Sequence, residues 1–418
     1  MAVEHRFLSS HEVCARLGIA PATLYAYVSR GLIRSEETPH SRSKRYWAED
    51  VARLLERREL KKAPEQVVSR SLDWGAPLLD SEICLIQAGQ FYYRGQNACA
   101  LSQSQTFEAV LALLWQSPPP DWALALESLK PLSLLQRKSD LSADRDPLWV
   151  LQNQLLALAA AEPRCWDLRP EGVLRTGTQI LALMTHSLCG QVPGERGLAQ
   201  TLAENWLPGS AMAAPLLNQA LILCAEHELN ISSFAVRCAA SAGCHPVQAF
   251  LAGLACFSGT RHGGAWARVE ALLQESERAD SPLQALSSRL QRGEPLYGFA
   301  HPLYPEGDPR WKALQSALPM DFDSSEGILL NKVAEAAFQL SAEQPNLDFA
   351  LVALCRLLGL PLPCAPAIFA LGRAVGWLAH LQEEYALKRL IRPRARYTGL
   401  APQNQGSENC TSGGNPVQ

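Results

Sequence analysis

The sequence lacks the features that mark several large classes of protein. Its 418 residues contain no run of about 18 apolar residues, so we expect no membrane span. The first residues, MAVEHRFLSS, show no basic region followed by an apolar run, so we expect no secretory signal. The twelve cysteines are scattered and form no CxxC pair, which favours a reduced, cytoplasmic protein over disulfides or structural zinc.

Common catalytic motifs are missing as well. We find no GxxxxGK[ST], GxGxxG or GxSxG, which argues against P-loop nucleotide binding, dinucleotide binding and α/β-hydrolase chemistry. The segment HELNI at 227–231 has Ile231 where a zinc-binding HExxH motif requires a second histidine. We therefore expect no metal site.

Charge is low overall but unevenly distributed. The formal net charge is −3. Residues 1–62 hold twelve Arg or Lys and eight Asp or Glu, which gives 12 − 8 = +4 and leaves −3 − 4 = −7 for the rest. A basic N-terminal segment thus precedes an acidic body.

The N-terminal segment has the pattern of two short helices joined by a glycine turn. Ser9 or Ser10 can cap a first helix that ends at Leu17, and Pro21 suits the first turn of a second helix to about Arg30. Between them Gly18 allows a tight turn. This is a helix-turn-helix, with an inner apolar stripe formed by Val13, Leu17, Ile19, Leu24 and Val28.

A basic loop and a third helix starting near Glu49 follow the helix-turn-helix. With RGLI and RYW, residues 1–62 resemble the MerR-type winged helix-turn-helix. We predict DNA contacts from the second helix and the wing, through Thr23, Tyr25, Tyr27, Arg30, Arg42, Lys44 and Arg45. A protein-docking or purely structural role stays open.

The rest of the chain divides into a linker, a helical body and a tail. Residues 63–80 are predicted to be a linker and 401–418 a disordered tail. The apolar segments between 106 and about 290 fit helical periodicity, and 83–95 fits a small hairpin. Because no strand series exists, we predict an all-α fold for the body, residues 81–400.

Seven polar residues lie in separate segments of this body, several beside Gly or Pro. They are His227, His262, His301, Arg310, Asp348, Arg373 and Arg392. Taken singly, His227 could be a core histidine of an apolar helix, and Asp348 an ordinary helix N-terminal charge with a lowered pKa. His380 we interpret as structural.

Together the seven residues suggest one chemistry. Three arginines can bind the carboxylates of a di- or tricarboxylate, since guanidinium and carboxylate pair in a planar fork. Histidines can polarise a carbonyl or protonate an alkoxide, and an aspartate can remove a proton from carbon beside a carbonyl. This set suits carbon–carbon bond formation between an enol and a keto acid.

The body resembles the citrate synthase family over roughly residues 81–400. The resemblance rests on these segments, in order: YYRG, FEAVLALLW, AEHELNISSFAVR, GTRHGGA, YGFAHPLYPEGDPR, NLDFA, IFALGRAVGWLAHLQEE and IRPRARYTG. It implies a two-domain helical homodimer, with a smaller mobile domain at roughly 265–365 and the residue matching Arg392 reaching the partner's site.

The resemblance also implies the substrates and the role of each residue. Oxaloacetate would bind to His227, His262, His301, Arg310, Arg373 and Arg392. Asp348 would deprotonate acetyl-CoA, with His262 and His301 as acid or electrophilic partners. The products would be citrate and CoA, as in the tricarboxylic acid cycle. Acetyl-CoA or another acyl-CoA would be a co-substrate, and no cofactor would be bound permanently.

The chain departs from the family on the side expected to bind CoA. Pro302 and Pro305 replace two basic residues, and Trp266 stands where Asn is usual, with Arg261 and Arg268 as candidates to compensate. Three functions therefore stay open: a citrate synthase, a 2-methylcitrate synthase using propionyl-CoA, and a carboxylate-sensing transcription regulator with little turnover.

Overall fold

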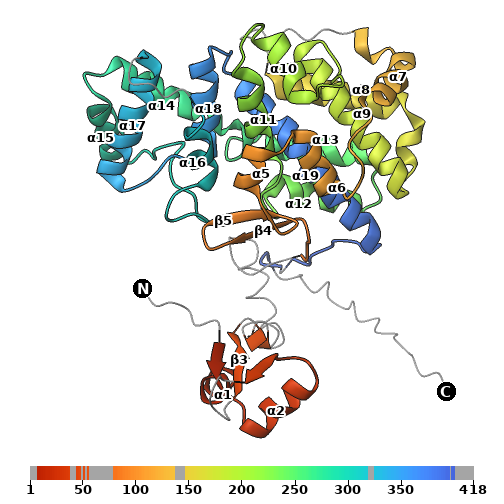
Figure 1. Cartoon of the computed structure of the whole chain (residues 1–418), viewed down its shortest axis with the longest axis vertical. Helices are drawn as coiled ribbons and strands as arrows, with labels where there is room; N and C mark the ends of the chain where they lie inside the picture. The colour runs from red at the N-terminus through yellow and green to blue at the C-terminus, as the bar shows by residue number, and fades with distance from the viewer. Residues whose placement is uncertain are drawn as a thin grey trace, which may run out of the picture. The chain divides into compact units, whose positions relative to one another are not determined.

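The structure is a computed structural model that describes residues 7–37, 44–48, 50–51, 54–55, 79–136, 146–318, 324–395 and 397–400 (Figure 1). The chain divides into two compact units. The first comprises residues 1–82 and the loop 300–306, and the second comprises residues 83–299 and 307–418. The predicted tail and all of the predicted linker except 79–80 lie outside the described residues.

The first unit contains the predicted helix-turn-helix beside a three-stranded antiparallel sheet of order β1-β3-β2. Ser9 caps α1 reciprocally with Glu12, and Gly18 ends α1 in the left-handed conformation. Pro21 then starts α2. The elements are β1 (Phe7–Ser9), α1 (Ser10–Leu17), α2 (Pro21–Ser29), β2 (Ser35–Glu37) and β3 (Lys44–Trp47).

The predicted inner stripe is confirmed, because all five of its residues belong to or pack on the small core of this unit. Two residues predicted to contact DNA are partly buried. Tyr27 packs in part against that core and is half-buried. Arg45 is half-buried, with its guanidinium over the Phe7 ring and 3.1 Å from the Glu36 carboxylate. Tyr25 and Arg30 are exposed as expected, as is Lys44, whereas Thr23 is half-buried and Arg42 lies outside the described residues.

The second unit begins with the predicted hairpin and continues as helices. Its strands form an antiparallel sheet of order β4-β5-β6: β4 (Cys84–Gln87), β5 (Gln90–Tyr93) and β6 (Gln96–Asn97). The helices up to the candidate site are α5 (Ala98–Ser104), α6 (Phe107–Trp115), α7 (Trp122–Leu129), η1 (Lys130–Leu132), η2 (Leu134–Gln136), α8 (Pro147–Ala161), η3 (Pro163–Trp166), α9 (Pro170–Cys189) and α10 (Leu198–Trp206).

The remaining helices carry most of the predicted site residues. They are α11 (Ala213–Cys224), α12 (Ile231–Ser241), α13 (Pro246–Phe257), η4 (Gly263–Ala265), α14 (Trp266–Arg278), α15 (Pro282–Gln291), α16 (Pro309–Gln315), α17 (Ser325–Ser341), α18 (Leu347–Leu358) and α19 (Cys364–Leu387). The all-α prediction for the body is confirmed, the hairpin aside.

Helix α19 is the centre of the second unit and packs against α9, α11, α12, α13 and α18. By length and composition it could cross a membrane, but its most apolar window is completely buried by other helices. That burial is typical of a core helix.

Helices α14, α15, α17 and α18 pack on one another and, with α16, gather to one side of α11 (Figure 1). They coincide with the segment 265–365 predicted to be the smaller domain. Motion of this group as a domain stays a prediction.

A buried cluster of charges joins α12 to the C-terminal half of α19. The fully buried Arg237 guanidinium lies 2.8 Å from Glu384 and 3.1 Å from Glu383. The half-exposed Arg389 lies 3.4 Å from Glu384. Removing one partner of a buried ion pair leaves an uncompensated charge, so the stability of this region depends on Arg237.

We predict that Arg237→Leu lowers the free energy of unfolding by about 3–5 kcal/mol, measured by denaturant titration. The matched Arg389→Leu, at the exposed end of the same cluster, should cost at most about 1 kcal/mol. Equal losses in the two variants would contradict the assignment of Arg237 as the buried partner.

Candidate active site

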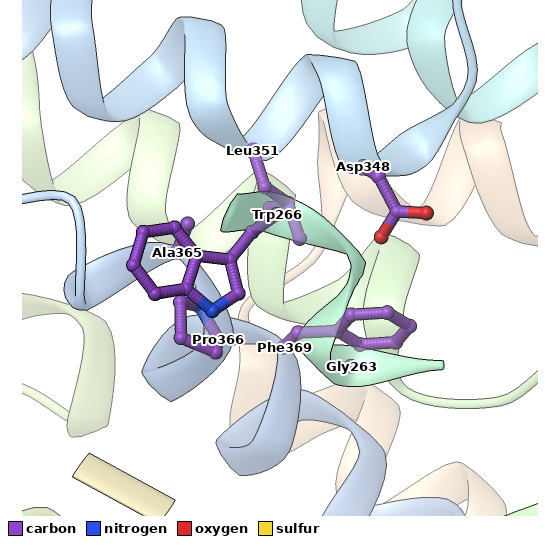
Figure 2. A pocket seen from close by; sticks show the side chains of 7 residues that line it. All are labelled: Gly263, Trp266, Asp348, Leu351, Ala365, Pro366 and Phe369. Carbon is purple, nitrogen blue, oxygen red and sulfur yellow. The ribbon is translucent and has the colours of Figure 1, made fainter. Parts of the chain in front are cut away.

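Asp348 stands in the first turn of α18, at the edge of a small pocket. Asn346 caps this helix and accepts a hydrogen bond from the Asp348 backbone N–H at 3.0 Å. Figure 2 shows the Asp348 carboxylate on the same side of the pocket as the Phe369 ring. The pocket is lined by Gly263, Trp266, Asp348, Leu351, Ala365, Pro366 and Phe369.

The environment of Asp348 changes its acidity. Burial raises the pKa of this carboxyl to about 6, Arg310 opposes the rise and Asp308 adds to it. Burial therefore outweighs the helix N-terminus, which would lower the pKa. Asp348 is thus ionised at neutral pH but basic enough to accept a proton from a weak acid.

His262 precedes η4 and is held by edge-to-face ring contacts and by one hydrogen bond. Its ring lies 4.9 Å from that of Phe257 and 5.9 Å from that of Phe369. Its Nε2 lies 2.8 Å from the Ser232 hydroxyl. Burial, helped by the Arg373 cation, lowers the pKa of His262 to about 3, so the imidazole is neutral at pH 7.

Arg373 projects from the middle of α19 and is 1% exposed. Its Nε donates a hydrogen bond to the carbonyl of Cys224 at 3.0 Å, and its guanidinium lies 5.3 Å from the Phe369 ring centre. No carboxylate of the described residues pairs with it. Because a buried guanidinium without a counter-ion is costly, Arg373 is suited to bind an anion.

Arg310 lies in the first turn of α16, and its cationic group pairs with Asp308, the cap of the same helix. The Asp308 carboxylate accepts bonds from Arg310 Nε at 2.9 Å and Nη2 at 2.7 Å. It also accepts a 3.2 Å bond from the backbone N–H of Leu347, the residue before Asp348. Both charged side chains are buried.

His227 lies beyond the end of α11, in the turn before α12, so its predicted place inside a helix is wrong. Its backbone N–H donates to the buried Glu226 carboxylate at 2.8 Å, and that carboxylate lies 3.4 Å from the His380 Nε2. A side chain at Gly376 would collide with Glu226, so glycine is required there. The structural interpretation of His380 agrees with its complete burial.

Three of the predicted residues, Arg310, Asp348 and Arg373, act electrostatically on Cys224, at the end of α11. Burial raises the pKa of this thiol to about 12, Arg373 and Arg310 oppose the rise, and Asp348 and Asp308 add to it. The Phe369 ring joins His262, Arg373 and Asp348 from another side. The structure thus brings His262, Asp348, Arg310 and Arg373 together, with His227 three residues beyond Cys224.

Two predicted residues, His301 and Arg392, are not among the contacts of this group. His301 lies in the loop 300–306 of the first unit, where its Nδ1 accepts a 3.2 Å bond from the N–H of Leu303. Arg392 is exposed on the segment that follows α19. That segment is tied to α12 by a 3.1 Å bond from Ile391 N–H to the Ser241 hydroxyl.

Sequence reasoning missed four supporting residues: Ser232, Asp308, Glu226 and Phe369. Asp308 carried a signal, because an acid at a helix N-cap two residues before an arginine can pair with it. Phe369 stands one helical turn before Arg373, and this spacing predicts that the two side chains share a face of the helix. Ser232 and Glu226 gave no such signal, because their partners His262 and His380 are distant in sequence.

Comparison with family models places residues 71–394 in "Citrate synthase, C-terminal domain", over more than half of the chain. The chain belongs to the citrate synthase family and is a citrate synthase-like enzyme. Residues 8–63 match "MerR HTH family regulatory protein", so the body carries a MerR-like helix-turn-helix domain at its N-terminus.

Individual relatives cover most of the chain. A citrate synthase of Haloferax volcanii is 29% identical over 78% of this chain and 94% of its own. A citrate/2-methylcitrate synthase of Bacillus subtilis is 28% identical over 75% of this chain and 91% of its own. The solved ternary complex of a Thermoplasma acidophilum citrate synthase with carboxymethyl coenzyme A and oxaloacetate has a TM-score of 0.66 at 23% identity, covering 80% and 97% of the two chains.

The raised pKa of Asp348 predicts a cost in stability that depends on pH. The ordinary value is 3.8 and the folded value about 6, so the folded state holds the proton more tightly. The cost of ionising Asp348 appears as pH rises between these values and is complete above about 6. We predict that Asp348→Asn has a higher melting temperature than the wild type at pH 7–8, with the difference vanishing below pH 4.

The surface variant Asp280→Asn should show no such pattern, because Asp280 is exposed. A stability gain for Asp348→Asn that is the same at pH 4 and pH 8 would refute the raised pKa.

Proposed function

We propose that the body condenses acetyl-CoA with oxaloacetate to give citrate and CoA. The carrying observation is the group around Phe369: a half-buried carboxyl of raised pKa, a neutral histidine and a buried arginine that has no counter-ion among the described residues. A base, an electrophile and an anion site lie around one aromatic ring, as enol formation beside a bound keto acid requires.

Asp348 is the proposed base. At pH above about 6 its carboxylate is ionised and removes a proton from the methyl group of the thioester. The neutral His262 stabilises the enol by donating a hydrogen bond to its oxygen. The enol carbon then attacks the ketone carbon of oxaloacetate, and hydrolysis of the thioester releases citrate and CoA.

Ser232 influences which nitrogen of His262 carries the proton. The Ser232 hydroxyl donates a 2.7 Å bond to Asn230 Oδ1, accepts a 3.2 Å bond from the indole N–H of Trp377 and lies 2.8 Å from His262 Nε2. A hydroxyl has one proton, so for Nδ1 of the neutral ring to hold the ring proton, Ser232 must turn its proton from Asn230 to Nε2. Nδ1 makes no hydrogen bond within the described part of the chain and is the proposed donor to the enol.

Oxaloacetate carries two carboxylates and a ketone. The arginines and the other histidines are the proposed ligands of these groups. Arg373 is the proposed primary carboxylate ligand, because its charge has no counter-ion among the described residues. Arg310, already neutralised by Asp308, would supply hydrogen bonds more than charge. His227 and His301 would complete the binding, with His301 protonating the new alkoxide.

We infer a homodimer in which Arg392 serves the partner's site. Its exposure on the segment after α19 supports this, since it is free to reach outside its own subunit. The acyl-CoA is a co-substrate and no cofactor is bound permanently. The Bacillus subtilis relative's name makes propionyl-CoA a second candidate substrate.

The N-terminal unit supports a second function, in DNA binding. Exposed Tyr25 on α2, Arg30 at the C-terminal cap of that helix and Lys44 on β3 offer groups suited to phosphates and bases. A regulator that senses a carboxylate with little turnover would use Arg373 in the same way but would not need Asp348 as a base.

Two substitutions separate these functions. Asp348→Asn should lower kcat by about 10²–10⁴-fold in a thiol-release assay with oxaloacetate and acetyl-CoA, because the amide cannot accept the proton. Oxaloacetate binding, measured by calorimetry, should persist. Arg373→Met should instead abolish that binding while the protein stays folded.

Asp280→Asn, an exposed aspartate, is the matched control and should keep full turnover. A wild type that binds oxaloacetate without releasing thiol would support the regulator. Undiminished turnover in Asp348→Asn would rule out Asp348 as the base.

For the N-terminal unit, neutralising Arg42 and Lys44 in the full-length chain should weaken binding to all DNA sequences. The slope of log K against log salt should flatten by about two, one for each lost phosphate contact. Arg16→Ala, exposed on α1 before the turn, is the control and should change the slope little. No affinity for genomic DNA fragments at low salt would favour a protein-docking role.

A further inference from the structure

The pocket beside Asp348 is apolar apart from that carboxyl and the Trp266 indole nitrogen. Its walls come from the starts of three helices, α14, α18 and α19. Figure 2 shows Trp266 with Ala365 and Pro366 at one side, Leu351 between, and Asp348 with Phe369 at the other side. Trp266 is the largest of these side chains and is the first residue of α14.

This geometry matters for the substituent on the reacting carbon. In an acyl thioester R–CH₂–CO–S–CoA, R is bonded to the carbon that loses its proton. If Asp348 removes that proton, as the proposed function holds, R lies within one bond of a carbon in contact with the carboxylate. R must then enter the apolar pocket.

The pocket is small. Its empty space is about 160 Å³ including the part open to solvent, and no point within it has room for a water molecule. With every side chain in place the pocket therefore leaves no space for a substituent larger than hydrogen, and Trp266 is its largest lining side chain.

We propose that Trp266 is the specificity-determining residue for acyl length. With it in place, R is hydrogen, so acetyl-CoA is accepted while propionyl-CoA and longer thioesters are excluded. The proposal rests on the proposed function, because it takes Asp348 as the base.

The test measures kcat/KM for acetyl-, propionyl-, butyryl- and hexanoyl-CoA with saturating oxaloacetate. Trp266→Ala should raise the ratio of kcat/KM for propionyl-CoA over acetyl-CoA by about 10–200-fold, the usual value of one methylene in a closed pocket. Trp266→Phe should give a smaller rise. Trp149→Ala, exposed on α8, is the matched control and should leave the ratio unchanged.

Leu351→Ala, on a neighbouring wall of the pocket, provides a second measurement if Trp266→Ala does not fold, and it should also favour propionyl-CoA. A wild type that uses propionyl-CoA as well as acetyl-CoA, or the same relative kcat/KM values in all variants, would overturn this inference alone. A wild type that neither turns over nor binds any of the four thioesters would overturn the proposed function and the inference together.

Discussion

The arrangement of the candidate site depends on one buried carboxylate, that of Asp308. At 2% exposure it must be paired to be stable, and it accepts bonds from the Arg310 guanidinium and from the Leu347 backbone. One side chain thereby caps α16, orients Arg310 and fixes the start of α18. Because Asp348 directly follows Leu347, the position of the proposed base is set by a residue 40 places earlier.

The same pairing explains how charges divide between the two sides of the site. Arg310 is neutralised by Asp308, so it lowers the pKa of Asp348 less than burial raises it. Arg373 has no carboxylate partner in the described part of the chain, and burial, helped by the Arg373 cation, keeps His262 neutral by lowering its pKa. A poised base and a neutral histidine can therefore exist within one group of residues that also holds two arginines.

Local features of this protein were readable from the sequence, and burial was not. The Ser9 cap, the Gly18 turn, the hairpin at 83–95 and the place of Asp348 in a first helical turn follow from nearby residues. The partial burial of Tyr27 and the turn that holds His227 depend on tertiary packing. The acidity of Asp348 does so too, since helix position alone gives the opposite sign of the pKa shift.

The free-energy cost of keeping Arg373 buried and Asp348 ionised helps to decide between an enzyme and a sensor. A buried Arg373 that has no counter-ion within the described ranges suits either function, because both bind a carboxylate. A carboxyl of raised pKa destabilises the folded chain at neutral pH and adds like charge beside an anion site. A sensor of anions would bind its ligand better without Asp348, whereas proton removal from carbon requires a base of this kind. The presence of Asp348 beside His262 thus favours catalysis.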